Sequence, residues 1–296
     1  MTTLAPVPEA GGNLPPRLPP GVGATGYTVA CRRAEESERA DRLFDDPFAS
    51  VFAATGSGTS AAIDFGQHSQ QQIEDLIAFG AITEFAFAVR TRFFDDVLLA
   101  ASGTCPQVVL LAAGLDARAF RLKWPAGTRV FELDLPAVLE FKEQVLESVD
   151  AEPTCVRTAA VADLAGDWKT ALLDTGFDPA IATAWLAEGL MLYLSSEEAE
   201  ALLSNVTELS SANSLLTFEH GAYADDLLLD RVVTTHAMRA AVSTWKGGLR
   251  VDPAAWLHAR GWIATTHALA DVGAGLGRDP PRHIAVDLVV ATRQSC

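Results

Sequence analysis

The chain has 296 residues, 49% of them hydrophobic, and a formal net charge of −16 at pH 7. This length suffices for the core of one large α/β domain with additions. The acidic balance, with a pI near 4.7, argues against nucleic acid and anionic membranes as partners, because both attract clustered Lys and Arg. We therefore expect a small-molecule substrate.

The cysteines indicate neither a metal site nor a disulfide framework. Four are present, far apart and without any C-x-x-C or Cys/His pairing: Cys31, Cys105, Cys155 and Cys296. The start of the chain has no basic segment followed by an apolar run, and no segment holds ~18 or more uninterrupted apolar residues. We expect a cytoplasmic protein with reduced thiols, no metal and no membrane partner, and the choice between monomer and homodimer stays open.

The N-terminal third predicts a tail and a helical cap. Residues 1–24 combine Pro-Pro steps with glycines and little periodic hydrophobicity, which predicts a disordered tail. A helical pattern begins at Thr28 and is interrupted at Asp46-Pro47, because proline disfavours helical geometry in the residue before it. With the helical segment that follows, residues 25–103 form the predicted cap.

That next segment, Gln67 to Ala101, is rich in helix formers and has apolar residues near a 3.6-residue period. We expect Gly80 and Thr91 to break it into pieces. Ser102-Gly103 ends it, and the first strand of a central sheet begins at Gln107.

From there strands and helices alternate, which predicts a parallel sheet with helices on both faces. The expected strands are 107–112, 129–133, 154–161, 180–186, 214–219, 263–267 and 283–292, and the expected helices are 115–122, 136–148, 167–175, 196–210, 222–243 and 252–259. We predict an α/β fold with a Rossmann-like, doubly wound, mostly parallel seven-stranded sheet whose last strand is antiparallel. The core would span 104–296, with a helical insertion at 221–260 and a Gly/Pro-rich loop at 271–282.

The segment Gln107 to Leu135 has the layout of a nucleoside-cofactor site: an apolar strand, a turn of small residues, and a second strand ending in acid about twenty residues later. The turn carries only Gly114 and closes with Asp116. A G-x-G-x-x-G turn would let a pyrophosphate approach backbone N–H groups, and this turn lacks it. A cofactor without phosphates therefore fits better than a dinucleotide.

Five ordered motifs between about residue 28 and residue 292 carry a family resemblance. They are DRLFDDPFA, VVLLAAGLDARAFRL, FELDLPAVLEFK, ADL at 162–164 and WLAEGLMLYL at 185–194. The chain resembles the S-adenosylmethionine-dependent methyltransferases of the leucine carboxyl methyltransferase type, and most of all the bacterial branch that includes polyketide carboxyl O-methyltransferases. The resemblance implies S-adenosyl-L-methionine as the cofactor.

The resemblance also implies binding residues for the methionine moiety, the ribose and the adenine of that cofactor. Gly114 would let the backbone approach the methionine moiety. Asp134 would accept hydrogen bonds from both ribose hydroxyls, with Glu132 as its rival on the same strand face. Asp163 and Leu164 match the family's adenine clamp, although an Asp that only caps the next helix is the alternative.

At the methionine end the resemblance points to Glu188 and Arg90. Glu188 would face the cationic groups of the cofactor, and its alternative is a structural ion pair with an arginine. Arg90 matches the family arginine that binds the cofactor carboxylate. Arg92 is turned away by ~200° on the same helix. Arg33 corresponds only loosely to a basic residue of the site, and we expect it on a solvated helix face.

Two residues depart from the family's G-A-G-x-D-T turn. Ala112 replaces its first glycine and Ala117 replaces its threonine. We expect Ala112 to adopt an ordinary negative φ with slightly wider clearance, which would weaken cofactor binding. Ala117 lacks a hydroxyl and so one hydrogen bond, on the order of 1 kcal/mol.

The sequence constrains the methyl acceptor less than it constrains the cofactor. A carboxylate nucleophile needs no general base at neutral pH, whereas a phenol does. His220, at the end of the fifth strand, and Tyr193 are the candidates for substrate orientation or base, ahead of Tyr223 and His236. Residues 221–250 would form a lid over an apolar substrate, with Arg239 or Arg250 orienting a carboxylate.

We therefore predict a methyltransferase that acts on the carboxylate of a small, hydrophobic, polyketide-like acid. Three alternatives are weighed against it: a phenol or enol O-methyltransferase of the same fold, an NAD-dependent oxidoreductase, and a non-methylating cofactor-binding protein of this fold. The single turn glycine disfavours the oxidoreductase, and the altered turn keeps the non-methylating protein in consideration.

Overall fold

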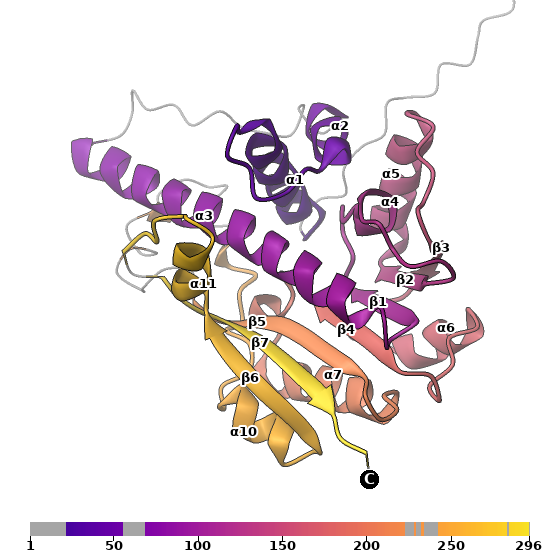
Figure 1. Cartoon of the computed structure of the whole chain (residues 1–296). Coiled ribbons are helices and arrows are strands. Elements are labelled where there is room, and N and C mark those ends of the chain that lie inside the picture. The colour runs from indigo at the N-terminus through magenta and orange to yellow at the C-terminus, as the bar shows by residue number, and fades with distance from the viewer. Residues whose placement is uncertain are drawn as a thin grey trace, which may run out of the picture.

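The central feature of the fold is a seven-stranded sheet of order β3-β2-β1-β4-β5-β7-β6 (Figure 1). The computed structural model describes residues 22–55, 69–222, 228, 232–233, 242–282 and 284–295. Strand β7 is antiparallel to both of its neighbours, β5 and β6, and the pairs among β1 to β5 are parallel. The predicted fold class is confirmed. The strands are β1 (Gln107–Leu111), β2 (Arg129–Asp134), β3 (Val156–Val161), β4 (Thr183–Ala187), β5 (Leu215–Ala222), β6 (Trp262–Ala268) and β7 (Ala285–Arg293).

The central strands are apolar on both faces because helices cover both sides of the sheet. Every residue of β1 and of β4 is buried, as expected of a parallel strand covered twice. Val108 and Leu110 of β1 pack into one core cluster with helices on one face of the sheet, while Val109 and Leu111 pack into the other with helices on the opposite face. The order reverses at β1, which pairs with β2 on one side and β4 on the other, and ligands of open α/β sheets bind at such a point.

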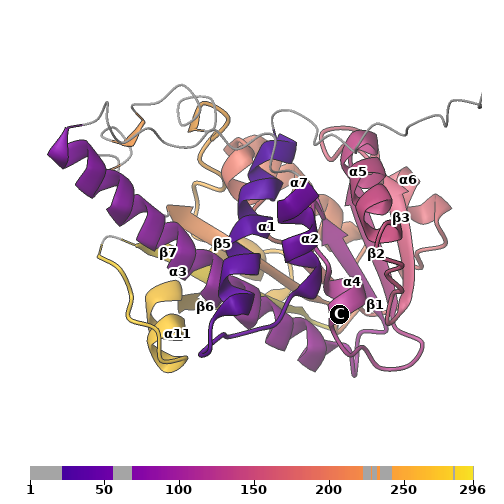
Figure 2. The same ribbon diagram turned by 90° about the horizontal axis from the view of Figure 1, so that it is seen from above.

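Three helices form the cap, which lies across one face of the sheet (Figure 2). They are α1 (Val22–Glu38), α2 (Pro47–Thr55) and α3 (Gln70–Ala101). The joint at Asp46-Pro47 is confirmed, but α1 begins at Val22 rather than at Thr28. The remainder of the expected tail, residues 1–21, lies outside the described residues.

The expected break of α3 at Gly80 and Thr91 is wrong, because the helix is continuous over 32 residues. An interior glycine costs about 1 kcal/mol relative to alanine, which the packing of α3 offsets. Thr91 is fully buried, so its β-branched side chain contributes to that packing. Ser69 begins the helix with a capping box to Gln72.

The remaining helices mostly follow the predicted alternation. They are α4 (Arg118–Arg121), α5 (Pro136–Glu147), α6 (Trp168–Asp174), the 3₁₀ helix η2 (Met191–Tyr193), α7 (Ser196–Glu208), α10 (Pro253–His258) and α11 (Leu269–Gly275). Helix α11 is a correction, since 271–282 was expected to be a loop throughout. Its Gly273 packs directly on the ring of Phe85 in α3, where any side chain would collide.

Within the predicted helical insertion at 221–260, residues 223–227, 229–231 and 234–241 lie outside the described residues. Strand β5 itself continues to Ala222. Within the described ranges, no helix combines the length and apolar character needed to cross a membrane.

Candidate cofactor and acceptor site

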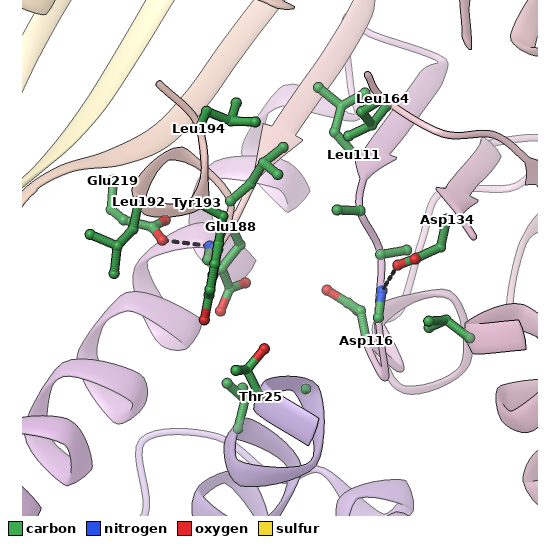
Figure 3. A pocket seen from close by; sticks show the side chains of 18 of the residues that line it. Thr25, Leu111, Asp116, Asp134, Leu164, Glu188, Leu192, Tyr193, Leu194 and Glu219 are labelled. Carbon is green, nitrogen blue, oxygen red and sulfur yellow. Dashed lines mark hydrogen bonds between the residues drawn. The ribbon is translucent and has the colours of Figure 1, made fainter. Parts of the chain in front are cut away.

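A cavity of about 960 Å³ lies at the carboxyl ends of β1, β2, β4 and β5, beneath α1 and α3. On one side lie the turn after β1, Asp134 and Leu164 (Figure 3). Facing them across the cavity are Glu188 and the segment 192–194. All six predicted cofactor-binding residues line this cavity: Arg90, Gly114, Asp134, Asp163, Leu164 and Glu188.

The turn after β1 has left-handed backbone at two positions. Gly114 has φ +50°, as glycine readily adopts. Ala112 also has φ +51°, so the expected ordinary φ at this residue is wrong. The left-handed region brings Cβ too close to backbone oxygen, at about 1–2 kcal/mol for an L-residue. Alanine therefore holds a conformation that glycine would adopt without this strain.

Asp134 closes the turn from the end of β2. Its Oδ2 accepts from the Gly114 N–H at 2.6 Å and its Oδ1 from the Leu135 N–H at 2.7 Å. Burial raises the pKa of Asp134, while these two backbone bonds oppose the rise. Each carboxylate oxygen has a second lone pair for a ligand in the cavity.

Glu132, the rival of Asp134, has other partners. Its Oε2 accepts from Lys142 Nζ and Arg157 Nη2, each at 2.7 Å, and both Glu132 and Lys142 are fully buried. Glu132 does not line the cavity. The charge of this carboxylate is thus compensated inside the protein, and Asp134 is the acid that faces the cavity.

Asp163 and Leu164 follow β3 at the far end of the cavity from Glu188. The Asp163 side chain is exposed, and its Oδ1 accepts from the Ala165 N–H at 2.9 Å. It does not cap α6, because Asp167 occupies the N-cap and accepts from the Thr170 N–H. The capping alternative for Asp163 is therefore excluded.

Glu188 follows β4 and contacts three arginines. Its Oε1 accepts from Arg33 at 3.0 Å and Arg90 at 3.1 Å, and its Oε2 accepts from Arg118 at 2.6 Å. Burial alone would raise the pKa of Glu188, but the three guanidinium groups outweigh it and hold the pKa well below its usual range. Glu188 therefore both faces the cavity and forms the structural ion pairs that were its alternative.

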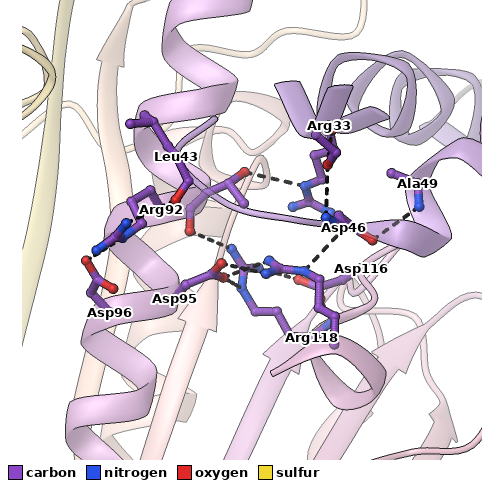
Figure 4. Close-up of polar contacts among 12 residues, drawn as sticks. Arg33, Leu43, Asp46, Ala49, Arg92, Asp95, Asp96, Asp116 and Arg118 are labelled. Atoms are coloured by element: carbon purple, nitrogen blue, oxygen red, sulfur yellow. Dashed lines mark hydrogen bonds and ion pairs between the residues drawn. The ribbon is translucent and has the colours of Figure 1, made fainter. Parts of the chain in front are cut away.

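Arg33 corrects the expectation of a solvated helix face. The residue is only 5% exposed and lines the cavity, with its Nε near the hydroxyl of Thr91. Figure 4 shows its side chain directed from α1 toward the buried acids. Arg92, in contrast, points outward and pairs with Asp96 at 2.8 Å, as its helical position predicts.

Arg118 was missed from the sequence although it anchors this cluster. It is fully buried and donates to Asp95 at 2.6 Å and to Asp116 (Figure 4). It also donates to Glu188 at 2.6 Å. Arg121, on the same short helix, adds two bonds to Asp95 at 2.6 and 2.8 Å. The sequence feature that could have indicated Arg118 is the placement of two arginines in DARAFRL, directly after a cofactor turn.

Ala117, the other departure from the family turn, stands at the N-cap of α4 with no side-chain capping bond. The missing hydroxyl is thus a missing helix cap. The backbone of Arg118 instead donates to Asp116 Oδ1 at 2.6 Å.

Glu219 is the second residue that the sequence reasoning missed. It lies on β5, lines the cavity and accepts from Arg90 Nη1 at 3.3 Å and from the Gly189 N–H. Burial raises the pKa of Glu219, and the charge of Glu188 adds to the rise. Arg90 therefore bridges acids from the ends of two adjacent strands.

His220, the next residue, is not among those lining the cavity. Because side chains alternate along a strand, His220 faces the side opposite to Glu219. Burial lowers its pKa, and its cross-strand neighbour is Asp287. Tyr193, the other candidate, does line the cavity, whereas Tyr223, His236 and Arg239 lie outside the described residues.

Apart from the polar groups described above, the cavity lining is mostly apolar and includes Tyr193. We use the name apolar half for a set of lining residues: Phe79, Thr83, Phe87, Leu192, Tyr193, Leu194, Val242, Trp245 and Lys246. Two segments of it are joined by backbone bonds, from the Lys246 N–H to Leu192 O and from the Gly248 N–H to Leu194 O, each 2.9 Å. Arg250, expected to orient a carboxylate, does not line the cavity.

No cluster of His, Cys, Asp or Glu among the described residues could hold a metal ion. The groups that line the cavity suit an organic ligand. Asp134 offers acceptors for a diol, Glu188 offers a carboxylate for a cation, and Arg33 and Arg90 offer guanidinium groups for an anion. A sheet of this order with that set of groups, and without a phosphate-binding glycine turn, defines a class I methyltransferase that uses S-adenosylmethionine.

The chain belongs to the leucine carboxyl methyltransferase family, whose model matches residues 26–207. A protein of Parafrankia sp. (strain EAN1pec) is 45% identical, over 93% of this chain and 87% of that protein. A protein of Streptomyces coelicolor (strain ATCC BAA-471 / A3(2) / M145) is 40% identical, over 88% and 89%. Both are provisionally named S-adenosyl-L-methionine-dependent methyltransferases. The non-methylating alternative and the oxidoreductase are thereby set aside.

One solved structure shares the fold at low sequence identity. The crystal structure of a duf574 family protein from Streptomyces avermitilis MA-4680 superposes with a TM-score of 0.54 at 14% identity, covering 87% of this chain and 98% of that one.

Proposed function

We propose that the protein transfers the methyl group of S-adenosylmethionine to the carboxylate of a small, hydrophobic, polyketide-like acid, and does so in the cytoplasm. The observation that carries the proposal is the apolar half of the cavity, which adjoins the polar groups and contains no histidine among the described residues that line it. A carboxylate is already ionised at neutral pH and needs no base there.

Each polar group of the cofactor has a partner of suitable chemistry in the cavity. Asp134 would bind the ribose diol, and Asp163 with the backbone of Leu164 would bind the adenine edge. Gly114 would pass close to the methionine part, Glu188 would face its cationic groups, and Arg90 would bind its carboxylate. Arg33 lies on the same oxygen of Glu188 as Arg90, so we add it to the carboxylate contacts.

The cofactor, when bound, supplies an electrophilic methyl group on a sulfonium. The task of the protein is then to hold a nucleophilic oxygen in line with that methyl group and to exclude water. Phe79, Phe87, Leu192 and Trp245 would enclose the apolar body of the acid. Tyr193 would orient its carboxylate through the phenol hydroxyl.

A phenol or enol acceptor is the second candidate function. The buried carboxyl of Glu219, at the end of β5, is the observation that favours it, because a hydroxyl nucleophile needs a base. We give His220 no role in either reaction, since its side chain lies on the other face of β5.

Titration with S-adenosylmethionine by calorimetry tests the cofactor assignment, and absence of saturable binding would refute it. Incubation with labelled cofactor and a panel of aromatic and aliphatic acids and phenols then tests the acceptor. Mild alkali separates the products, because a methyl ester hydrolyses and an aryl ether survives. A product stable to alkali would replace the first candidate function by the second.

A further inference from the structure

Lys246 is held at the rim of the apolar half by its own backbone. Its N–H donates to Leu192 O at 2.9 Å, the Gly247 N–H donates to the same oxygen at 3.2 Å, and Gly248 continues the contact to Leu194. The lysine therefore keeps a fixed position next to the segment that carries Tyr193, although its side chain is long.

The other described cations of the cavity wall have different partners. Arg33 and Arg90 contact Glu188, on the cofactor's side of the apolar half. Arg32 pairs with Glu35 along α1 at 2.7 Å. Lys246 is thus the described cation of the cavity lining whose backbone is bonded to the segment that carries Tyr193.

The partner of Lys246 is Glu198, a residue with a second structural role. Lys246 Nζ lies 2.9 Å from Glu198 Oε1 and 2.8 Å from Oε2. Glu198 Oε2 also accepts from the Ser195 N–H at 2.7 Å, which completes the capping box of α7. The Lys246 and Glu198 side chains are 51% and 42% exposed. An ion pair this exposed contributes little, so Lys246 can exchange one carboxylate for another at small cost.

We propose that Lys246 recognises the methyl acceptor by binding its carboxylate, and that Glu198 is the competing carboxylate that holds the lysine when no acid is present. This rests on the proposed function, because it names the residue that selects an acid over a neutral molecule of the same shape. Lys246 then fills the role that the sequence suggested for Arg239 or Arg250.

Two variants should change acid binding in opposite directions. Lys246→Met keeps the apolar stem and removes the charge, so it should weaken binding of an acid roughly tenfold or more. Glu198→Gln removes the competitor but retains the capping box, which accepts Gln as well as Glu, so it should tighten binding severalfold. A purely structural role of the pair would weaken binding in both variants.

Calorimetry on protein saturated with S-adenosylhomocysteine measures these affinities without turnover. The probes are cinnamic and decanoic acid, each beside its primary amide, which has the same shape without the charge. We expect wild type to prefer each acid and Lys246→Met to lose that preference. Lys169→Met is the matched control and should behave as wild type. It removes a comparable surface ion pair, in which Lys169 of α6 lies 2.8 Å from Glu208 of α7.

Equal affinity of wild type for acids and amides would overturn the proposal, as would an unchanged preference in Lys246→Met or weaker acid binding in Glu198→Gln. Failure of the proposed function has a different signature: no binding of S-adenosylmethionine, or a methylated product stable to alkali.

Discussion

Arg118 and Glu188 lie 70 residues apart in sequence and meet in a 2.6 Å ion pair inside the protein. Arg118 belongs to the short helix after the cofactor turn, and Glu188 follows the neighbouring strand. The pair therefore joins the two strand ends between which the sheet order reverses. Since Arg118 also pairs with Asp95 of α3, the cap is connected to the same point.

Glu188→Gln should destabilise the protein at neutral pH. Three arginines would lose a buried partner, and breaking a buried pair costs about 3–5 kcal/mol. Because the pKa of folded Glu188 is depressed, its contribution is present above the unfolded value of about 4.3 and is lost as pH falls. Urea unfolding across a pH series should show the gap between wild type and variant closing in acid. Glu140→Gln on the surface of α5 serves as the control, and a gap independent of pH would contradict the expectation.

Glu219→Gln should have the opposite pH dependence. The pKa of folded Glu219 is raised, so the stability of wild type relative to the variant is greatest below the usual glutamate range and declines as pH rises through the raised pKa. Unfolding at about pH 4 and about pH 8 measures this. A stability difference between the two proteins that does not change with pH would show that folding does not raise the pKa of Glu219.

Asp134→Asn should weaken binding of S-adenosylmethionine by roughly 1–3 kcal/mol. The amide oxygen can still accept from Gly114, but the amide NH₂ cannot accept from a ribose hydroxyl. Calorimetry measures the affinity, and a melting curve checks that the fold is kept. Glu132→Gln is the informative comparison, because it should lower stability through Lys142 and Arg157 and leave cofactor affinity nearly unchanged. The reverse pattern would move the ribose assignment to Glu132.

Ala112→Gly should stabilise the protein, by up to about 1 kcal/mol, because glycine adopts φ +51° without the Cβ clash. Ala113→Gly, one residue on and outside the left-handed region, should destabilise by about 0.5–1 kcal/mol. Denaturant unfolding of both variants tests the contrast. Equal effects would mean that the backbone at Ala112 is not strained, and cofactor titration of Ala112→Gly would show whether the strain affects binding.

Gly248→Ala should impair acceptor binding while leaving cofactor affinity intact. Gly248 has φ +69°, and a Cβ there would lie 3.0 Å from Met191 O, so the bonds that place Lys246 beside Leu192 would be disturbed. Gly247→Ala is the matched control, since its φ is +94° with no atom within 4 Å of the added Cβ. Affinity for cinnamic acid should fall more in Gly248→Ala than in Gly247→Ala, and equal losses would indicate backbone strain alone.

The sequence predicted the sheet well because parallel strands buried on both faces are apolar throughout, as in β1 and β4. It placed Asp134 and Gly114 at the cavity because Asp134 ends β2 and Gly114 lies in the turn after β1. Prediction from the sequence failed where contacts between distant segments determine the local structure. The helix α11 depends on contact between Gly273 and Phe85, and nothing local to a Gly/Pro-rich segment indicates that contact.

The same limit applies to the charged cluster. Arg33, Arg118 and Glu219 are ordinary charged residues in their local sequence, and only the meeting of α1, α3 and two strand ends buries them together. For Ala112, the alanine itself suggested ordinary backbone, whereas hydrogen bonds from Ala113 to Leu133 and from Gly114 to Asp134 fix the turn from the neighbouring strand.

Helix α3 contributes side chains both to the apolar half of the cavity and to the polar groups around Glu188. Its 32 residues form a rod of about 48 Å, with Phe87 in the apolar half, Arg90 on Glu188, and Asp95 on Arg118. A rod without a hinge cannot move at one of these points alone. An acid that displaces Phe87 would shift Arg90 as well, so the size of the acceptor and the affinity for the cofactor should be thermodynamically linked. Bulky acids should then alter the affinity for S-adenosylmethionine without contacting the cofactor.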